Sequence, residues 1–487
     1  MKCAITFTWL LLSILTPSIG ASADVPASPY LKYVYQYADA MLAAGRDTFG
    51  PQPSGLFLSA LDRTTMKPLT VRPAPPGGIR REDRVGPPWE ALVGANPHHD
   101  ENLLRVLYVL SELSGKPVYA EAADNELKWF LEHAASPETH LLAWGEHMYW
   151  NTQLDEPNPK QPDAVHEFAR PWVLWDRCYE LAPEACQKFA RGLWDHQIAN
   201  QATGAFDRHA KFWSHGPADN MDYPRHAGFY IRTWADAYAH SQDMTFLHAI
   251  ETLVNRYEQK RHPKTRLIPQ RGADAKYAST QTLSMVIDCA AAARRLPMPL
   301  AARLRDFVNR EDEVFCNWKH EVAGSGGFVV EADRATGTPS AKHSSLWDAR
   351  YGGATTAMIG MMCVARYEHS GKTGYRDLIT AAADAYLESE PPEDTDAWPM
   401  TYGHAISLEL AAWRSTAQPK YLERARELGT IAIELFFQDR PLPRASLKTG
   451  HYEAITGADS LALALVEVHL ASRHITAVTA PDNTIDR

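Results

Sequence analysis

The sequence LSGKPVYAEAA at residues 113–123 decides the fold, because its pattern recurs along the chain. A second copy, HSGKTGY at residues 369–375, also leads into an alanine-rich run, and degenerate copies occupy residues 240–246 and 415–421. In each copy a polar turn is followed by an aromatic residue that opens a helix, and then by small residues that allow close packing. Such helix–turn–helix units bury their apolar faces only by packing against neighbouring units.

Apolar residues recur with the period of an α-helix through most of the chain, for example at Leu103, Val106, Leu107 and Leu110. The pattern predicts helices near residues 28–45, 98–114, 117–134, 163–180, 183–199, 222–241, 244–261, 278–295, 299–314, 345–369, 373–388, 402–415, 418–436 and 456–473. Strand signals are weak except around residues 327–330, and residues 47–97 are rich in proline and glycine, which predicts a long irregular loop. The irregular repeat spacing and the long aromatic loops favour a closed ring over an open solenoid. We therefore expect an all-α fold, an incomplete (α/α)6–7 toroid of helical hairpins with few short strands and a loop-lined groove at one end.

The first 23 residues have the pattern of a cleavable secretory signal. Lys2 precedes a short apolar run that ends in Ala21-Ser22-Ala23, and the run is well short of the ~20 residues that a membrane span needs. We expect residues 1–23 to be removed and residues 24–487 to form a single toroidal catalytic domain. The mature protein should be secreted or periplasmic, monomeric, and not attached to a membrane.

Charge and cysteine content limit the classes of function. The chain has 49 basic and 59 acidic residues and a formal net charge of −10, so nucleic-acid binding through the overall field is not expected. Six cysteines among 487 residues are too few for a disulfide scaffold. Cys178 and Cys186 flank a short helix break, where they form either a local disulfide or two small buried apolar groups.

The middle of the chain departs from this acidic average. Residues 205–276 contain 11 Lys or Arg and 8 Asp or Glu, together with many histidines and aromatics. His209 lies in the first part of this segment, and the sequence Asp222-Tyr223-Pro224-Arg225-His226 opens a predicted helix. Arg271 and Tyr277 follow at the next loop–helix junction. A locally basic region in an acidic protein favours binding of a polyanion.

The order Arg225-His226, Arg271, Tyr277 resembles that of the α/α-toroid uronate lyases, which include alginate lyases. In that family a helix carries a carboxylate-neutralising pair that contains His, and an Arg and then a Tyr follow about fifty residues later. The resemblance implies that Tyr277 is the base and acid, with Arg271 beside it and with His226 and Arg225 neutralising the substrate carboxylate. The family usually has an Asn beside the His, where this chain has Arg225, so Asn151 is expected to supply the missing amide.

The residue types suit β-elimination independently of the resemblance. Removing the proton from C5 of a uronate requires that a positive or hydrogen-bonding group first neutralise the adjacent carboxylate. The reference pKa of tyrosine is about 10, so a tyrosine base needs a neighbouring cation. The expected reaction is cleavage of a 4-linked uronate polymer such as alginate, glucuronan or pectate, and the expected partner is this anionic polysaccharide.

Two further polar and aromatic stretches are expected to bind the polymer. Residues 144–151 are predicted to form a sugar-binding rim, and residues 342–353 a second helix start at which Arg350 and Tyr351 compete for the base role. The predicted substrate-binding residues are Tyr149, Trp150, Asn151, Glu146, His147, Tyr223, His209, His343, Trp347, Arg350 and Tyr351.

No cofactor is expected, and a divalent metal ion is the alternative. His98, His99, Asp100, Glu146, His147 and His226 are ligand types that suit such an ion. Some toroidal pectate lyases place a His/Glu/His metal site beside an Arg base, and Arg225-His226 also fits that pattern.

Two other functions stay open at this point. One is an α/α-barrel glycoside hydrolase that uses carboxylates such as Glu146, Asp222 and Asp348; the other is a non-catalytic glycan-binding protein.

Overall fold

The computed structural model describes residues 28–85, 91–145, 148–158, 165–166, 171–216, 221–480 and 483. The predicted signal segment, residues 1–23, lies outside this part of the chain. The helices are α1 (Pro29–Ala44), α2 (Pro97–Ser114), α3 (Val118–His133), α4 (Trp175–Leu181), α5 (Pro183–Gly192), α6 (Pro224–Ser241), α7 (Met244–Gln259), α8 (Ser279–Ala292), α9 (Met298–Asn317), α10 (Thr356–Ser370), α11 (Thr373–Tyr386), α12 (Pro399–Thr416), α13 (Pro419–Ala432) and α14 (Ala458–Arg473).

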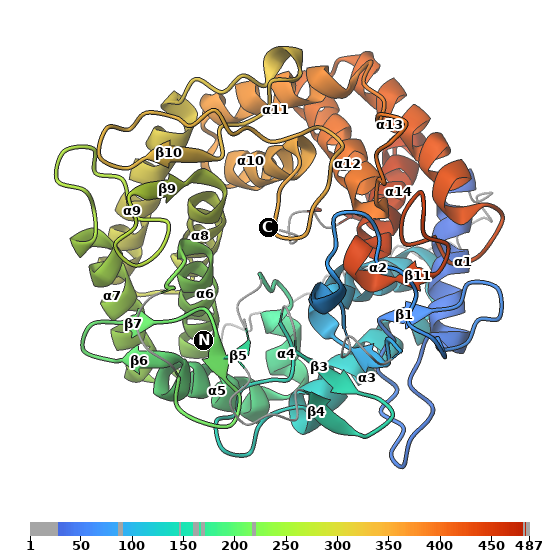
Figure 1. Cartoon of the computed structure of the whole chain (residues 1–487), viewed down its shortest axis with the longest axis horizontal. Coiled ribbons are helices and arrows are strands. Elements are labelled where there is room, and N and C mark those ends of the chain that lie inside the picture. The colour runs from blue at the N-terminus through green and yellow to red at the C-terminus, as the bar shows by residue number, and fades with distance from the viewer. Residues whose placement is uncertain are drawn as a thin grey trace, which may run out of the picture.

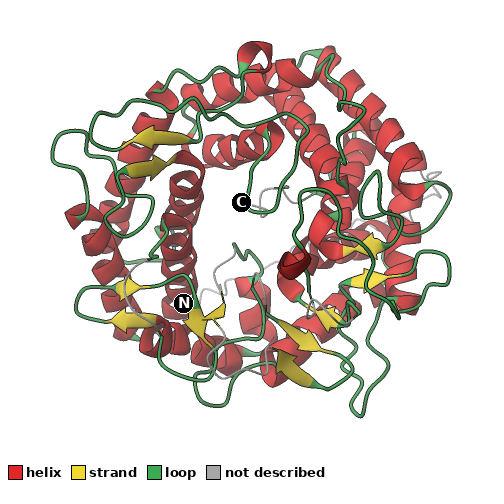
Figure 2. Ribbon diagram, viewed as in Figure 1, coloured by secondary structure: helices red, strands yellow, loops and turns green. Residues whose placement is uncertain are grey.

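The helices form a ring of two layers, as Figure 1 and Figure 2 show. Inner helices α2, α4, α6, α8, α10, α12 and α14 alternate along the chain with the outer helices. Among neighbouring inner helices, α6 with α8 and α12 with α14 pack together most extensively. Helix α14 also packs against α1 and α2, which closes the ring. The predicted all-α toroid is confirmed.

The strands are short and are confined to the loops. They are β1 (Ala60–Leu61) with β11 (Tyr452–Glu453), β2 (Gly94–Ala95) with β3 (Tyr149–Asn151) and β4 (Glu156–Asn158), β5 (Val165–His166) with β8 (Ala210–Lys211), β6 (Ile198–Asn200) with β7 (Ala205–Phe206), and β9 (Lys276–Ala278) with β10 (Glu331–Asp333). All these pairs are antiparallel.

The two ends of the ring differ in their loops. Each inner helix leads to the next outer helix through a short turn, such as residues 115–117 after α2 or 371–372 after α10. Gly115 and Gly371, from the repeated sequence pattern, take φ values of 68° and 66° there and cap the preceding helix in the left-handed conformation that glycine favours. Each outer helix leads to the next inner helix through a longer loop, and these loops carry all the described strands. We call the long-loop end the mouth and the opposite end the turn face.

The mouth is the end at which the inner helices begin. Because short turns join each inner helix to an antiparallel outer helix, successive inner helices run in the same direction. Their amino termini therefore gather at the mouth, where the helix dipoles favour negative charge. The long loops at the mouth agree with the prediction that loops line one end of the toroid.

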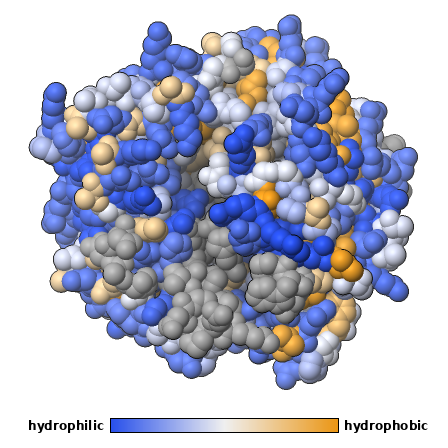
Figure 3. Space-filling model, viewed as in Figure 1, coloured by the Kyte–Doolittle hydropathy of each residue, from blue (hydrophilic) through white to orange (hydrophobic). Residues whose placement is uncertain are grey.

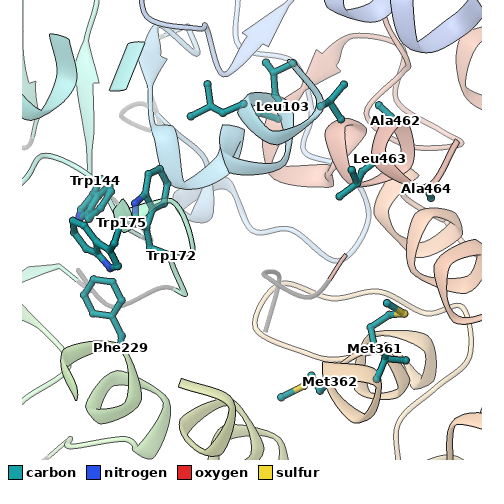
Figure 4. Close-up of a cluster of buried hydrophobic side chains, with 14 of the residues drawn as sticks. Leu103, Trp144, Trp172, Trp175, Phe229, Met361, Met362, Ala462, Leu463 and Ala464 are labelled. Carbon is teal, nitrogen blue, oxygen red and sulfur yellow. The ribbon is translucent and has the colours of Figure 1, made fainter. Parts of the chain in front are cut away.

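Aromatic side chains from several elements form part of the core. Trp144 lies 4.9 Å from Trp172 and 5.4 Å from Phe189, measured between ring centroids. Figure 4 shows Trp144, Trp172 and Trp175 gathered above Phe229 of α6. Burial of such large aromatic side chains contributes much of the packing energy of the toroid. None of the helices in the described part of the chain is both long and apolar enough to cross a membrane.

Three local predictions were wrong. The helix expected at 163–180 begins only at Trp175 within the described residues, and the helix expected at 345–369 begins at Thr356, where the Thr355 side chain accepts the Met358 N–H. Residues 327–330 form only isolated bridges, Gly327 with Glu321 and Val329 with His343, and the continuous strand β10 follows at 331–333, where it pairs with β9. Of the two alternatives left open for Cys178 and Cys186, the structure has the second, because both thiols are free and buried, and burial raises the pKa of the Cys178 thiol.

Candidate active site

The first turn of α6 places two predicted site residues at the mouth. Tyr223 is the extended residue before the helix, and Pro224 opens it with the fixed backbone angle that suits a first position. The His226 N–H donates to the Tyr223 carbonyl at 3.2 Å, and the imidazole of His226 is fully buried. The Tyr223 and His226 rings lie 5.9 Å apart, between centroids. Arg225 stands between them in the sequence and is partly exposed.

Two arginines converge on the Tyr223 side chain. Nη1 of Arg271 donates to the phenolic oxygen at 3.4 Å, and Cζ of Arg208 lies 5.3 Å from the ring centroid. The charge interaction with Tyr223 is the largest cause of a raised pKa of Arg271. The Tyr223 phenol therefore has two guanidinium groups beside it. The expected pairing of Arg271 with a tyrosine therefore exists, but the tyrosine is Tyr223 instead of Tyr277.

The Asp222 carboxylate holds the Arg271 loop against the start of α6. Its carboxylate accepts from Arg256 Nε at 2.7 Å, from the Gly272 N–H at 2.5 Å and from Lys260. The bond to Gly272 ties the loop that carries Arg271 to the start of α6. Because Asp222 is buried and surrounded by donors, it does not suit the role of a free acid or base in a hydrolase. The prediction of Asp222 as a hydrolytic carboxylate is not supported.

Tyr277 lies elsewhere. Its side chain is 1% exposed and packs edge-on against Trp318, with 5.0 Å between ring centroids. Burial, followed by the charge of Glu311 on α9, raises its pKa well above the usual value. The role of Tyr277 as base is therefore corrected, because a buried phenol beside a carboxyl group cannot reach a polymer. The alternation of side chains in β9 directs it towards the outer layer.

The rim predicted at residues 144–151 is largely internal. Tyr149, Trp150 and Asn151 are buried in β3. The Asn151 side-chain oxygen accepts the N–H of Gln153 at 3.0 Å, so its amide shapes the turn after the strand. Trp150 packs edge-on against Trp129. These placements correct their predicted contacts with sugar. Glu146 and His147 lie outside the described residues.

The stretch at residues 342–353 borders a cavity of about 370 Å³ at the mouth. His343 and Arg350 line this cavity, as does Gln270, the neighbour of Arg271. Trp347 is buried and donates to Ser389 Oγ at 2.9 Å, so its predicted sugar contact is corrected. Tyr351 packs against the apolar cluster of Ile79, Trp398 and Ile455. His209 is partly exposed, with Nδ1 at 3.3 Å from Asp207 Oδ1.

The described residues contain no group of three His, Cys, Asp or Glu side chains able to hold a metal ion. His98 stacks on Trp144 at 3.9 Å between ring centroids, inside the aromatic core. Asp100 is buried, and its pKa is raised by burial and then by the charges of Glu126 and Asp459. His98 and Asp100 thus belong to the packed interior. Glu146 and His147, two of the predicted ligands, lie outside the described residues, so the divalent ion stays a proposal.

Arg208 is the site residue that the sequence reasoning missed. It precedes His209 in the basic segment at residues 205–276, and only the folded loop shows that its guanidinium lies beside the Tyr223 ring. The signal was the basic composition of residues 205–276, which did not single out one arginine. Asp348, the other hydrolase candidate among described residues, forms an exposed ion pair with Arg350 at 2.7 Å.

The part of the chain that contains this site matches a known sequence family. Residues 89–288 match the family model of periplasmic pectate lyases. The match includes Arg208, Tyr223, Arg225, His226 and Arg271, and it confirms the resemblance to polysaccharide lyases of toroidal fold. A curated relative, the pectate disaccharide-lyase of Dickeya dadantii (strain 3937), is 22% identical over 155 residues, which are 32% of this chain. The aligned part spans only 28% of that relative's length.

Solved structures with a similar chain path have very different sequences. A D-mannose isomerase is 7% identical with a TM-score of 0.49, over 90% of this chain and 96% of that one. An unsaturated glucuronyl hydrolase specific for heparin is 9% identical with a TM-score of 0.47, over 92% of this chain and 99% of that one. The cellobiose 2-epimerase from Bacillus thermoamylovorans B4167 is 9% identical with a TM-score of 0.46, over 91% and 99%. At these identities and scores they say nothing about the activity of this chain.

Proposed function

We propose that this protein is a periplasmic polysaccharide lyase that cleaves a 4-linked uronate polymer by β-elimination, with pectate as its first substrate. The single observation that carries the proposal is the convergence of Arg208 and Arg271 on Tyr223 at the start of α6. This cluster lies inside the segment that matches periplasmic pectate lyases. Alginate and glucuronan are further substrates to test, because they present the same acidic group beside C5.

The mouth suits the charge that develops in this reaction. The partly exposed Arg225 guanidinium, at the amino terminus of α6, is placed to neutralise a substrate carboxylate, and the buried His226 imidazole lies beneath it in the same turn. In the proposed step the Tyr223 phenolate takes the C5 proton, the C4–C5 double bond forms, and the C4–O bond breaks. The same phenol then returns the proton to the leaving glycosidic oxygen. Arg271 and Arg208 stabilise the phenolate before the step and after it.

A divalent ion is the second way to neutralise the carboxylate, and Arg225 would then replace Tyr223 as the base. Two measurements separate these mechanisms. Activity that persists in a chelator and disappears in Tyr223→Phe supports the phenol. Activity that a chelator removes and a divalent ion restores, with Tyr223→Phe still active, supports the metal-assisted mechanism.

The decisive experiment follows product chemistry. Purified protein is incubated with polygalacturonate, alginate and glucuronan, and the ultraviolet absorbance of the unsaturated uronate is recorded with time. Rising absorbance on any of these polymers supports the lyase, and the fastest substrate identifies the polymer. New reducing ends without absorbance would overturn the proposal in favour of a hydrolase. Fractionation of the producing cells tests the periplasmic location.

A further inference from the structure

One segment of the mouth is held in place more firmly than its irregular sequence suggests. Residues 72–84, between β1 and β2, form what we call the arginine arm. The arm contains four arginines, Arg72, Arg80, Arg81 and Arg84, and two acidic residues, Glu82 and Asp83. In Figure 1 this blue segment extends inward over the opening of the ring, beside the loop that precedes α10. Figure 3 shows strongly hydrophilic side chains over the middle of the same face.

The base of the arm is anchored by a buried ion pair. Arg84 donates through Nε and Nη2 to the two carboxylate oxygens of Glu453, each at 2.7 Å. His451 Nε2 lies 2.7 Å from the same carboxylate. The Arg84 side chain is 0% exposed and that of Glu453 is 3% exposed. A two-point pair of this kind fixes geometry as well as charge.

The tip of the arm is anchored by its backbone. The Gly77 N–H donates to Asp396 Oδ2 at 2.7 Å, and Trp398 Nε1 donates to the Gly77 carbonyl at 2.9 Å. The Tyr351 N–H donates to the Gly78 carbonyl at 3.0 Å. Gly78 has a φ of 84°, and a Cβ at this position would lie 2.6 Å from the Ala349 carbonyl oxygen, so only glycine allows this approach. The arm therefore abuts the loop that carries Arg350.

The anchored arm presents guanidinium groups to solvent. The Arg80 side chain is 69% exposed and is held by Asp83, with Nη2 at 2.6 Å from Oδ1. Arg81 follows it on the same turn and is exposed, and it forms no ion pair with the described residues. Arg350, across the contact with Gly78, is 72% exposed. Glu82 is also exposed on this turn, so the arm carries both signs with arginine in excess.

We propose that Arg81, supported by Arg80, forms a second subsite that binds carboxylates of the polyuronate away from the α6 cluster. This inference rests on the proposed function and adds a binding site to it. The physical reason is pre-organisation, because a guanidinium on a fixed turn loses little freedom when it pairs with a carboxylate. A polymer that crosses the mouth would contact α6 at one position and the arm at another.

The test compares matched arginines at opposite ends of the ring. Arg81→Ala and Arg81→Glu are made in the full chain, with Arg294→Ala and Arg294→Glu as controls. Arg294 is an exposed arginine just after α8, at the turn face. Binding to polygalacturonate is measured by affinity electrophoresis, and KM and kcat by absorbance, at low and high salt. Thermal melting of each variant checks the fold.

The expected results separate binding from chemistry. Arg81→Ala should raise KM for the polymer about threefold and Arg81→Glu about tenfold, with kcat nearly unchanged and a weaker dependence on salt. Both Arg294 variants should behave as wild type. Equal effects at the two positions, or none at Arg81 in a protein that cleaves uronates, would overturn the subsite and leave the proposed function standing. Absence of both binding and cleavage with every uronate polymer would overturn both proposals.

Discussion

Nη1 of Arg271 lies 3.4 Å from the phenolic oxygen of Tyr223, although 48 residues separate them in the chain. This contact links the loop after α7 to the start of α6, and Asp222 fixes it by accepting the Gly272 N–H. A cation held beside a phenol is the arrangement that a tyrosine base needs near neutral pH.

Tyr223→Phe should abolish most turnover without unfolding the protein. The substitution removes only the hydroxyl group, so we expect kcat to fall at least ~100-fold, within the range typical of lost acid–base catalysis. Initial rates on polygalacturonate, together with a circular-dichroism melt, measure this effect. Tyr277→Phe is the matched control and should keep near-normal activity. Loss of activity in Tyr277→Phe with retention in Tyr223→Phe would restore Tyr277 as the base.

Arg225→Ala should weaken stabilisation of the transition state more than it weakens binding of the substrate. Loss of a group that neutralises the substrate carboxylate is expected to lower kcat/KM about 100-fold. Arg225→Lys should recover part of this loss, because it keeps the charge but not the planar fork. Full activity in Arg225→Ala would exclude a role for this side chain in neutralisation or proton transfer.

Glu409→Gln should stabilise the protein at alkaline pH. Burial of this α12 carboxyl group raises its pKa from 4.5 to about 9. The folded state therefore keeps a proton that the unfolded state releases, so the free energy of unfolding falls as pH rises from about 4.5 to 9. The amide cannot ionise, and we expect the variant to be more stable than wild type by roughly 1–3 kcal/mol at pH 9 and similar at pH 5. Urea unfolding at both pH values measures this difference, and Glu423→Gln on the exposed face of α13 is the control. Parallel pH curves for Glu409→Gln and wild type would contradict the prediction.

Glu453→Gln should destabilise the fold and loosen the arginine arm. It leaves the buried Arg84 guanidinium without its counter-charge, which typically costs about 3–5 kcal/mol. Although burial opposes it, the hydrogen bonds from His451 and Arg84 hold the pKa of Glu453 below its usual value, so the stabilisation by this carboxylate is present above pH 4.5 and is lost as pH falls further. Denaturant unfolding at pH 7 provides the measurement. Glu427→Gln, which removes an exposed partner of Arg424, should cost less than ~1 kcal/mol. Equal losses in the two variants would show that burial does not decide the cost.

The sequence predicted the architecture because helices and their turns are local features. The spacing of Leu103, Val106, Leu107 and Leu110 predicted a buried helical face, and all four side chains are buried in α2. The repeated Ser-Gly turns at 114–115 and 370–371 mark two of the short connections of the turn face. The alternation of short turns and long loops then places the chemistry at one end.

The site was only partly predictable because its geometry depends on distant contacts. Arg225, His226 and Arg271 were expected together, and they lie at the same end of the ring as Tyr223. The direction of Tyr277 depends on pairing of β9 with β10, whose register no local pattern reveals. The bond between Arg84 and Glu453 spans 369 residues, so residues 47–97 could be expected only as an irregular loop.

The separation of mouth and turn face makes the molecule suitable for oriented attachment to a solid support. Lys116 is an exposed residue of the turn between α2 and α3, at the opposite end of the ring from the loops that carry the arginines. The described cysteines are buried except Cys316, which is partly buried and whose thiol has a pKa raised to about 11, so they should react slowly. A Lys116→Cys variant coupled to a maleimide surface would therefore sit with its catalytic side facing the liquid, ready to receive long polymer chains.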